Sequence, residues 1–391
     1  MNQFNKIQET IASVQPINKV EEINLQNALN RILQEDAVAD LNMPPFDKSA
    51  MDGYACRFED IGQPMEVLET ISAGSVPTKK IAQNQCSKIM TGAALPEGAD
   101  CVFKIEDSEQ PDEKRVVCTN AKTAKNICCQ GEDYKKGEVL ISKGTKINES
   151  HLAVLAGAGY SRVKVSGSPK IALAATGSEL VEPDQIPPAG KIRNSNASQV
   201  SAQLKKMGID ATYLGLAADN YQKLSDLVTG TLEKFDILIF TGGASVGDFD
   251  FIPRILKEQK FTVLWERSGL KPGNPITVAR KEKKFCIGLS GNPVSSLVQF
   301  EFIAKPLLYR LMNANVRPTR IKARMASGFH RKKADRIAVI PVKMDDNGEI
   351  ETIPFHGSAH INSLVQANAL MEVPVNKFEI SKGDFAHVRP I

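Results

Sequence analysis

Four short segments combine glycine with small polar residues or lysine, and each follows an apolar run. They are TGSE (176–179), TGGASVGD (241–248), KPGNP (271–275) and SGNPVSS (290–296). Glycine carries no side chain, so backbone N–H groups in such segments can approach a ligand closely. The fourth segment leads into a predicted helix, whose first N–H groups would be unpaired and would favour an anion. The segments therefore predict a cradle for phosphate or another oxyanion.

The candidate binding residues within these segments share a small or polar character or a fixed backbone. They are Gly242, Gly243, Ser245, Gly247, Lys271, Asn274, Pro275, Ser290, Asn292 and Pro293. Lysine suits an oxyanion as a point charge, and Lys271 is the cation of its segment. Arg267 lies four positions earlier, and its guanidinium would also suit an oxyanion. Alternatively, Arg267 is a solvent-exposed side chain that forms an ordinary surface ion pair.

Two carboxylates accompany the segments and suggest a metal. Asp250 follows the second segment, and Asp219 follows a predicted strand that ends near Leu214. Mg²⁺ binds a few carboxylate oxygens together with phosphate and water, so a carboxylate pair beside a phosphate cradle suits it. Each aspartate could instead be a helix N-cap, a position that this residue favours.

His356 and His360 are the other candidate metal ligands, because they are four positions apart. Gly357-Ser358-Ala359 between them is typical of a loop. Zinc sites normally take two histidines from a helix or add further ligands. We therefore do not expect zinc here.

An open sheet between residues 170 and 311 would bring the four segments together. Apolar runs typical of strands occur at 171–175, 209–214, 236–240, 261–265, 276–280 and 285–289, and helical periodicity occurs between several of them. A long helix is expected over 294–311. Uninterrupted apolar strands joined by helices predict a parallel sheet covered on both faces. Ligands bind such sheets beyond the carboxyl ends of the strands, where the segments lie.

The flanking regions differ in texture. Ile7, Ile11 and Val14 fall at helical spacing, and we expect the helical pattern to continue through residues 20–33. Prolines 44 and 45 then forbid a helix. Residues 45–145 show short apolar runs between turn residues, which predicts a mostly β module. A small all-β region follows Asn313, with a hairpin turn signal at residues 345–348.

Composition restricts the class of protein. A chain of 391 residues is longer than one hydrophobic core usually serves, which favours two to four domains. Its 42% hydrophobic and 24% charged residues exclude a disordered or fibrous protein. The net charge of +4 is too small to indicate a nucleic-acid binder, and no apolar run is long enough for a membrane span. The seven cysteines form no C-x-x-C pair, so we expect reduced thiols in a cytoplasmic protein.

Several motifs resemble the molybdopterin molybdenumtransferases, the family that includes MoeA and the gephyrin E domain. They are PPFDKSAMDGYA (44–55), KIMTGA (88–93), PEGAD (96–100), GED (131–133), TGGASVG (241–247), GLSGNPVS (288–295) and SLVQANAL (363–370). The first of them is highly specific, and together they span almost the whole chain.

The resemblance implies that the protein inserts molybdate into adenylylated molybdopterin, releasing AMP and forming molybdenum cofactor. It also implies Mg²⁺ or another divalent cation, a homodimer with its active site at the subunit interface, and contact with the molybdopterin adenylyltransferase and apo-molybdoenzymes. It implies a split domain of residues 1–44 and 136–168, a β domain of 45–135, an α/β molybdopterin-binding domain of 169–312 and a C-terminal β domain of 313–391.

The family's functional positions fall on residues of both the β module and the sheet. The resemblance implies catalytic roles for Asp52, Thr91, Asp133 and Glu179, and metal binding by Asp219 and Asp250. It also places functional positions on Lys271 and Pro293, which are already candidate binding residues, and it implies that Arg336 and Ser358 help to hold molybdate.

The chain departs from the family pattern at several of these sites. Cys128 and Cys129 stand where arginine is common, Ser290 replaces a proline, Asn274 replaces a lysine, and Arg267 replaces a lysine. A lost charge-assisted hydrogen bond is worth about 1–3 kcal/mol, so anion affinity would change while activity remains. Two alternatives stay open: adenylylation of molybdopterin, and a non-catalytic dimeric scaffold.

Overall fold

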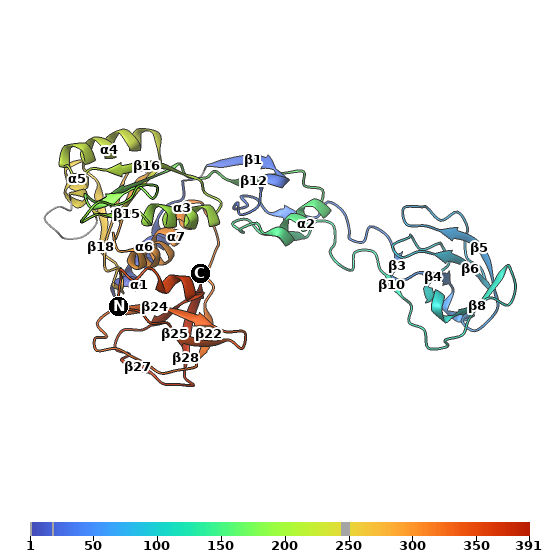
Figure 1. Ribbon diagram of the computed structural model, residues 1–391. Coiled ribbons are helices and arrows are strands. Elements are labelled where there is room, and N and C mark those ends of the chain that lie inside the picture. Colours follow the sequence, from blue (N-terminus) through green and yellow to red (C-terminus); the bar gives the residue numbers. More distant parts are fainter. Residues whose placement is uncertain (1, 18, 244–250) are drawn as a thin grey trace. The chain divides into compact units, whose positions relative to one another are not determined.

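The structure divides into two compact units, and the chain passes from the first unit into the second twice. The computed structural model describes residues 2–17, 19–243 and 251–391. Unit 1 contains the residues up to Glu35, Lys143–Leu152 and Arg162–Ile391, and unit 2 contains Asp36–Ser142 and Ala153–Ser161. Figure 1 shows the elements of both units. The finer division into four domains stays a prediction.

A six-stranded sheet organises the α/β part of unit 1, in the order β16-β13-β17-β21-β20-β18. Its strands are β13 (Ile171–Thr176), β16 (Ala211–Ala217), β17 (Ile237–Thr241), β18 (Thr262–Arg267), β20 (Pro275–Lys281) and β21 (Lys284–Leu289). The first four strands in the spatial order are parallel to one another. The predicted α/β fold is therefore confirmed.

The sheet is not wholly parallel, which corrects the prediction. β20 pairs antiparallel with both β21 and β18. Glu282 and Lys283 alone separate β20 from β21 along the chain. A parallel connection needs a crossover of a dozen or more residues, so this short link forces a hairpin.

Helices cover both faces of the sheet. They are α1 (Gln3–Ser13), α3 (Asn196–Lys206), α4 (Tyr221–Lys234), α5 (Ile252–Glu258), α6 (Pro293–Gln299) and α7 (Lys305–Leu311). Residues of α1, α3, α6 and α7 pack in one apolar core, and those of α4 and α5 pack in another. The long helix expected over 294–311 is continuous but includes a π-helical turn, η4 (Phe300–Ala304), between α6 and α7.

The C-terminal region of unit 1 is all-β, as the sequence predicts, and its strands close into a small barrel. Its strands are β22 (Ile321–Met325), β24 (Ile337–Met344), β25 (Glu349–Thr352), β26 (Ala369–Val373) and β28 (Phe385–Pro390). β26 pairs with both β28 and β24, which closes the ring. β23 (Phe329–His330), β27 (Glu379–Ile380) and helix α8 (Ser363–Gln366) complete the region. A two-residue strand from the α/β part, β19 (Leu270–Lys271), joins the barrel by pairing parallel with β24.

The expectation of helix beyond residue 14 is wrong. Val20–Asn24 forms strand β1, which pairs antiparallel with β12 (Arg162–Ser166), and a 3₁₀ turn, η1 (Leu25–Asn27), follows. Tertiary pairing with a distant strand overrides the local helical pattern here. A helix, α2 (Glu149–Gly157), precedes β12 along the chain.

Unit 2 contains a second six-stranded sheet, in the order β7-β4-β6-β5-β9-β8. Its strands are β4 (Gly53–Cys56), β5 (Met65–Ile71), β6 (Gln85–Ile89), β7 (Cys101–Lys104), β8 (Ser108–Glu109) and β9 (Arg115–Cys118). Two short pairs accompany it: β2 (Ala37–Val38) with β11 (Val139–Ile141), and β3 (Lys48–Ser49) with β10 (Ile127–Cys128). The mostly β module is thus confirmed.

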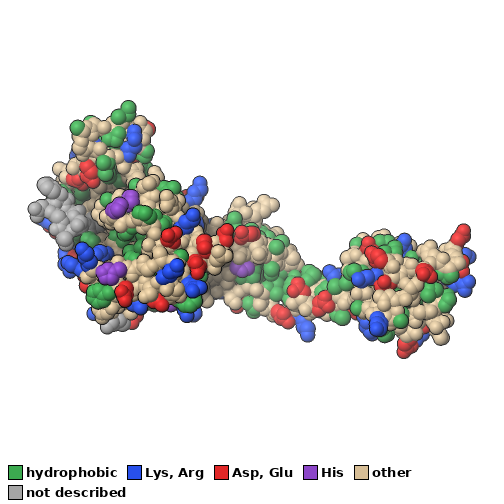
Figure 2. Space-filling view, turned by 60° about the horizontal axis from the view of Figure 1, so that its bottom comes forward, with side chains coloured by type: hydrophobic (Ala, Val, Ile, Leu, Met, Phe, Trp, Pro, Cys, Tyr) green, Lys and Arg blue, Asp and Glu red, His purple; other side chains and the backbone are tan. Residues whose placement is uncertain are grey.

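The surface mixes both signs of charge. On the face that Figure 2 presents, Lys and Arg side chains are interspersed with Asp and Glu side chains. Among the described residues, no helix combines the length and the apolar character needed to cross a bilayer.

Candidate functional site

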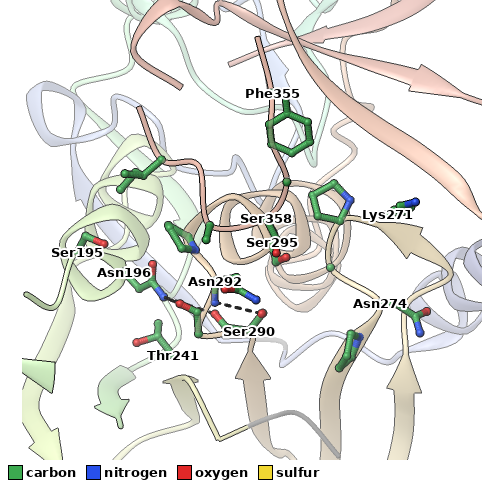
Figure 3. Close-up of a pocket in the computed structure, with 18 of the residues that line it drawn as sticks. Ser195, Asn196, Thr241, Lys271, Asn274, Ser290, Asn292, Ser295, Phe355 and Ser358 are labelled. Carbon is green, nitrogen blue, oxygen red and sulfur yellow. Dashed lines mark hydrogen bonds between the residues drawn. The ribbon is translucent and has the colours of Figure 1, made fainter. Parts of the chain in front are cut away.

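A cavity of about 1140 Å³ lies within unit 1, beyond the carboxyl ends of β13, β17 and β21. The predicted residues that line it are Glu179, Lys271, Asn274, Pro275, Ser290, Asn292, Pro293, Arg336 and Ser358. In Figure 3, Asn196 and Thr241 lie on one side of Ser290 and Asn292, and Lys271 and Asn274 lie on the other. The structure therefore brings together residues from all four predicted segments and from the C-terminal barrel.

Strand pairing places Lys271 beside the barrel residues. Lys271 on β19 pairs with Ala338 on β24, two positions after Arg336. The Arg336 guanidinium donates to Asp335, whose pKa is lowered by its own backbone N–H, by Arg336 and by Lys271. Two cations thus meet at the cavity wall, which suits a dianionic ligand.

Arg331, another cation in the cavity wall, has a structural role. Arg331 donates to the backbone carbonyl oxygens of Lys377 and Arg336, both at 2.8 Å, and of Pro374. Burial lowers its pKa. Its nitrogens therefore hold the barrel loops rather than a ligand.

The start of α6 differs from the expectation. Pro293 has no N–H group, and the Val294 N–H donates to the carbonyl oxygen of Ser358 at 3.0 Å. The predicted free donors at this helix end are therefore partly used within the protein. Ser358 accordingly holds the barrel loop against α6 through its backbone.

Three polar atoms in the cavity region are buried without a hydrogen-bond partner among the described residues. They are Thr176 Oγ1, Thr241 Oγ1 and Asn196 Oδ1, and each residue is less than 9% exposed. Asn196 is oriented by its Nδ2, which donates to the Gly291 carbonyl oxygen at 2.7 Å. An unpaired buried acceptor costs about 1–3 kcal/mol, so these atoms are poised to bind a polar ligand.

The glycines after β17 allow close packing between two loops, a role that the sequence did not predict. A Cβ on Gly242 would lie 2.2 Å from the Thr176 carbonyl oxygen, and its φ is +94°. Gly242 and Gly243 thus let this loop pack against the end of β13, and neither of them lines the cavity. Ser245, Gly247 and Asp250 lie outside the described residues.

The acidic residues at this sheet edge have different local partners. Asp219 Oδ2 accepts the Ser178 N–H at 2.6 Å and so joins the loop after β16 to the loop after β13. Asn220, and not Asp219, caps α4, so the N-cap alternative for Asp219 is wrong. The exposed Glu179 carboxylate folds over Gly177, where it would lie 2.8 Å from an added Cβ.

Asn274 has an internal role that its replacement of a lysine did not predict. Its Oδ1 accepts the Gly269 N–H at 3.1 Å, which stabilises the turn that leads into β19. The residue also contributes to the cavity wall. It thus positions Lys271 rather than supplying charge.

The remaining predicted site residues lie in unit 2. Asp52 Oδ1 accepts both the backbone N–H and the Oγ1–H of Thr91, each at 2.7 Å. Both hydrogen bonds lower the pKa of Asp52, and the bond from the Thr91 backbone N–H has the larger effect. Asp133 is exposed, and its backbone N–H donates to the Met43 carbonyl oxygen at 3.0 Å. The structure thus joins Asp52 to Thr91 but shows no direct contact from them to Asp133.

Gly53 explains why a glycine follows Asp52. A Cβ at position 53 would lie 1.9 Å from the Phe103 carbonyl oxygen on the neighbouring strand. Glycine is therefore required for β4 to pack against β7, and this packing carries Asp52 to the strand end.

The two histidines of the predicted pair contact each other. The imidazole rings of His356 and His360 stack at 5.0 Å, and His360 Nδ1 accepts the His356 backbone N–H. Over the residues that the structure describes, no three His, Cys, Asp or Glu side chains form a group that could hold a metal.

Sequence reasoning missed several residues of the site. Thr176, Thr241 and Asn196 line the cavity with buried polar atoms, and Gln299 lies fully buried behind two of its loops. Thr176 and Thr241 each end an apolar strand, which is a usable signal. The only sequence signal for Gln299 is that a polar residue occurs within the apolar face of a predicted helix.

The site and fold define a multidomain protein with a ligand-binding α/β domain between two β modules. The chain matches three family descriptions: the MoeA N-terminal region (domain I and II) over residues 3–159, a probable molybdopterin binding domain over 172–310, and the MoeA C-terminal region (domain IV) over 322–391.

Individual relatives agree with these matches. The chain is 37% identical to the molybdopterin molybdenumtransferase of Staphylococcus epidermidis, over 90% of this chain and 86% of the relative. The Staphylococcus aureus protein of the same name is 35% identical over the same shares. The crystal structure of the molybdopterin biosynthesis MoeA protein from Pyrococcus horikoshii matches with a TM-score of 0.84 and 27% identity, covering 99% of both chains. The chain therefore belongs to the MoeA family of molybdopterin molybdenumtransferases.

Proposed function

We propose that this protein inserts molybdate into adenylylated molybdopterin, with release of AMP and formation of molybdenum cofactor. The observation that carries the proposal is the cavity of unit 1. It combines the cations Lys271 and Arg336 with unpaired buried oxygen atoms, in a chain whose relatives carry this activity in their names.

The two ends of the cavity suit two parts of the reaction. Lys271 and Arg336 provide positive charge for molybdate, a tetrahedral dianion. Thr176 and Thr241 provide polar atoms at the strand ends, and Asn196 provides one at the start of α3, in the region where phosphate-bearing ligands bind in such folds. Charge grows on the phosphoryl oxygens as the phosphoanhydride link breaks and AMP leaves, and preorganised cations stabilise that charge.

Asp52 supplies a carboxylate for the same reaction. Because the two bonds from Thr91 lower its pKa, Asp52 is ionised at neutral pH. It can therefore accept a proton or hold a positive charge, but it cannot act as a general acid. We assign Asp133 and Glu179 as further acidic groups of the reaction, and Thr91 as the residue that orients Asp52.

Mg²⁺ is proposed as the metal, held by Asp219 and Asp250. The donor chemistry of Asp219 fits, since one carboxylate oxygen accepts the Ser178 N–H and the other has no hydrogen-bond donor among the described residues. A site with few protein ligands suits Mg²⁺, which keeps phosphate and water oxygens around it. When bound, the ion would neutralise phosphoryl charge.

We also propose a homodimer in which the active site combines unit 1 of one subunit with unit 2 of the other. A mixture of Asp52→Ala and Lys271→Ala subunits tests this arrangement. Activity is measured at a molybdate concentration near the wild-type KM, where sites that lack Lys271 contribute little. Random mixing makes half the dimers mixed, and each of these would contain one intact site, giving about a quarter of wild-type activity. No recovery in verified mixed dimers would show that each site belongs to one subunit.

The direct test of the function is AMP release from adenylylated molybdopterin by the purified protein, with and without molybdate and Mg²⁺. Molybdate-dependent release is the expected result. ATP-dependent adenylylation of molybdopterin would instead establish the preceding reaction, and ligand binding without release would indicate a scaffold.

The protein is proposed to work in the cytoplasm. Its proposed partners there are the molybdopterin adenylyltransferase, which makes its substrate, and the apo-molybdoenzymes, which accept its product.

A further inference from the structure

Gln299 is a fully buried side chain at the end of α6, and its amide joins two segments of the cavity wall. Its Nε2 donates to the carbonyl oxygen of Gly273 at 2.8 Å and to that of Pro275. Its Oε1 accepts the Ser290 N–H at 2.7 Å. One side chain thus holds the segment that carries Lys271 against the segment that leads into α6.

The orientation of this amide is unambiguous. Rotating it by 180° would place the NH₂ group against the Ser290 N–H and the oxygen against two carbonyl oxygens. All three bonds would then be lost in a buried place. The network therefore has one low-energy arrangement, which makes it a rigid spacer.

The residues around Gln299 leave its side chain little room to move. A Cβ on Gly273 would lie 3.0 Å from Gln299 Cγ, so the loop already packs closely on this side chain. The Ser268 hydroxyl also donates to the Gly273 carbonyl oxygen at 2.6 Å. The π-helical turn η4 begins at the next residue, Phe300, and such turns often occur at functional sites.

Ser290 is the residue that makes the connection possible. Proline has no N–H group, so a proline at this position could not donate to Gln299. Ser290 also accepts the Asn292 N–H through its Oγ at 3.2 Å. Its backbone donor serves Gln299 and its hydroxyl serves the turn before α6.

We propose that Gln299 is a positioning residue that sets the distance between Lys271 and the Ser290–Pro293 turn, and thereby the affinity for the oxyanion substrate. It does not line the cavity, so it acts through the two segments. The inference rests on the proposed function for its kinetic readout, but the network itself is measurable without activity.

A double-mutant cycle of Gln299→Met and Ser290→Pro tests the pair. Gln299→Met keeps the length of the side chain but leaves the Ser290 N–H unpaired. We expect the KM for molybdate to rise about tenfold while kcat changes less than about threefold. Ser290→Pro should also raise KM, by leaving Oε1 without its donor. The double variant contains neither the Ser290 N–H nor Gln299 Oε1, so neither group is left unpaired. The increase in KM should therefore be well below the product of the two single effects.

Gln259→Met is the matched control, because this half-buried glutamine donates to Ser225 in the same α/β part and touches neither segment. Its KM should equal that of wild type. Single effects that multiply in the double variant, or an unchanged KM in Gln299→Met, would overturn the proposal.

Amide hydrogen exchange separates this inference from the proposed function. With ¹⁵N-serine labelling, the Ser290 amide should exchange at least about tenfold faster in Gln299→Met than in wild type or Gln259→Met. Equal exchange would refute the network role. If wild-type protein released no AMP, only the proposed function would fail, since the exchange result would still decide the role of Gln299.

Discussion

The cavity of unit 1 and the Asp52 face of unit 2 have contrasting designs. The cavity is concave and carries cations and buried unpaired oxygen atoms, whereas Asp52, Thr91 and Asp133 are exposed. The carboxylate of Asp52 is held by two short hydrogen bonds and is surrounded by solvent. One region is built to bind a ligand before reaction, and the other is built to present a fixed negative charge.

From this contrast we expect substrate binding and the chemical step to respond to different residues. Changes in unit 1 should act mainly on KM, because they alter contacts with the bound substrate. Changes at Asp52 should act mainly on kcat. The following variants test whether the division holds, beginning with the largest expected effect.

Asp52→Ala should lower the single-turnover rate of AMP release by about 10²–10⁴-fold, the usual range for a lost acid–base group. Calorimetric affinity for adenylylated molybdopterin should stay within about threefold of wild type. Asp112→Ala is the control, since Asp112 is another exposed carboxylate of unit 2 with a lowered pKa. A large loss of affinity in Asp52→Ala would contradict the division of roles.

Lys271→Ala should raise the KM for molybdate by about 10- to 100-fold, because one charge-assisted contact is lost. The rate at saturating molybdate should change little. Lys281→Ala removes an exposed lysine at the far end of β20 and should leave both constants unchanged. If kcat fell while KM stayed constant, Lys271 would belong to the chemical step.

Gly53→Ala should destabilise unit 2 by about 1–3 kcal/mol, because the added Cβ would clash with the Phe103 carbonyl oxygen. Thermal unfolding followed by hydrogen exchange should show the loss in unit 2 peptides and not in the sheet of unit 1. Gly157→Ala in α2 is the control, since its Cβ would meet Tyr134 at an ordinary 3.7 Å. Equal destabilisation of both units would show that they unfold together.

Thr91→Val should raise the pKa of Asp52 by removing the hydroxyl donor, while Thr91→Ser should keep it low. A carboxylate NMR titration measures this directly. Because the folded pKa is lowered, the Thr91 bonds stabilise the fold above the unfolded pKa of about 3.9. That stability is lost as the pH falls through the folded pKa. An identical titration curve in the valine variant would show that the backbone N–H alone sets the pKa.

Sequence patterns predicted the elements whose pattern is local. The strands that end at Thr176 and Thr241, the helices between them and the β character of both flanking regions follow from apolar runs and turn residues. The four glycine-rich segments correctly indicated the sheet edge, and each of them contributes at least one residue to the cavity wall.

The features that escaped prediction depend on distant partners. β1 looks helical until its pairing with β12 is known, and β20 looks parallel until the length of its link to β21 is considered. The roles of Asn274 and Gln299 arise from hydrogen bonds to backbone atoms of loops. Residue type alone does not reveal such bonds.

The entry and exit of the chain at unit 2 have a consequence for folding order. The Leu33 N–H donates to the Thr145 carbonyl oxygen at 2.9 Å, and β1 pairs with β12 although Asn24 and Arg162 are 138 positions apart. Closing a flexible loop of that length costs about 4 kcal/mol in chain entropy. Within unit 2, Ala37 already pairs with Ile141, so the folded insertion holds its own two ends together. During synthesis, β1 emerges long before its partner strand, and folding of unit 2 shortens the loop that later joins them.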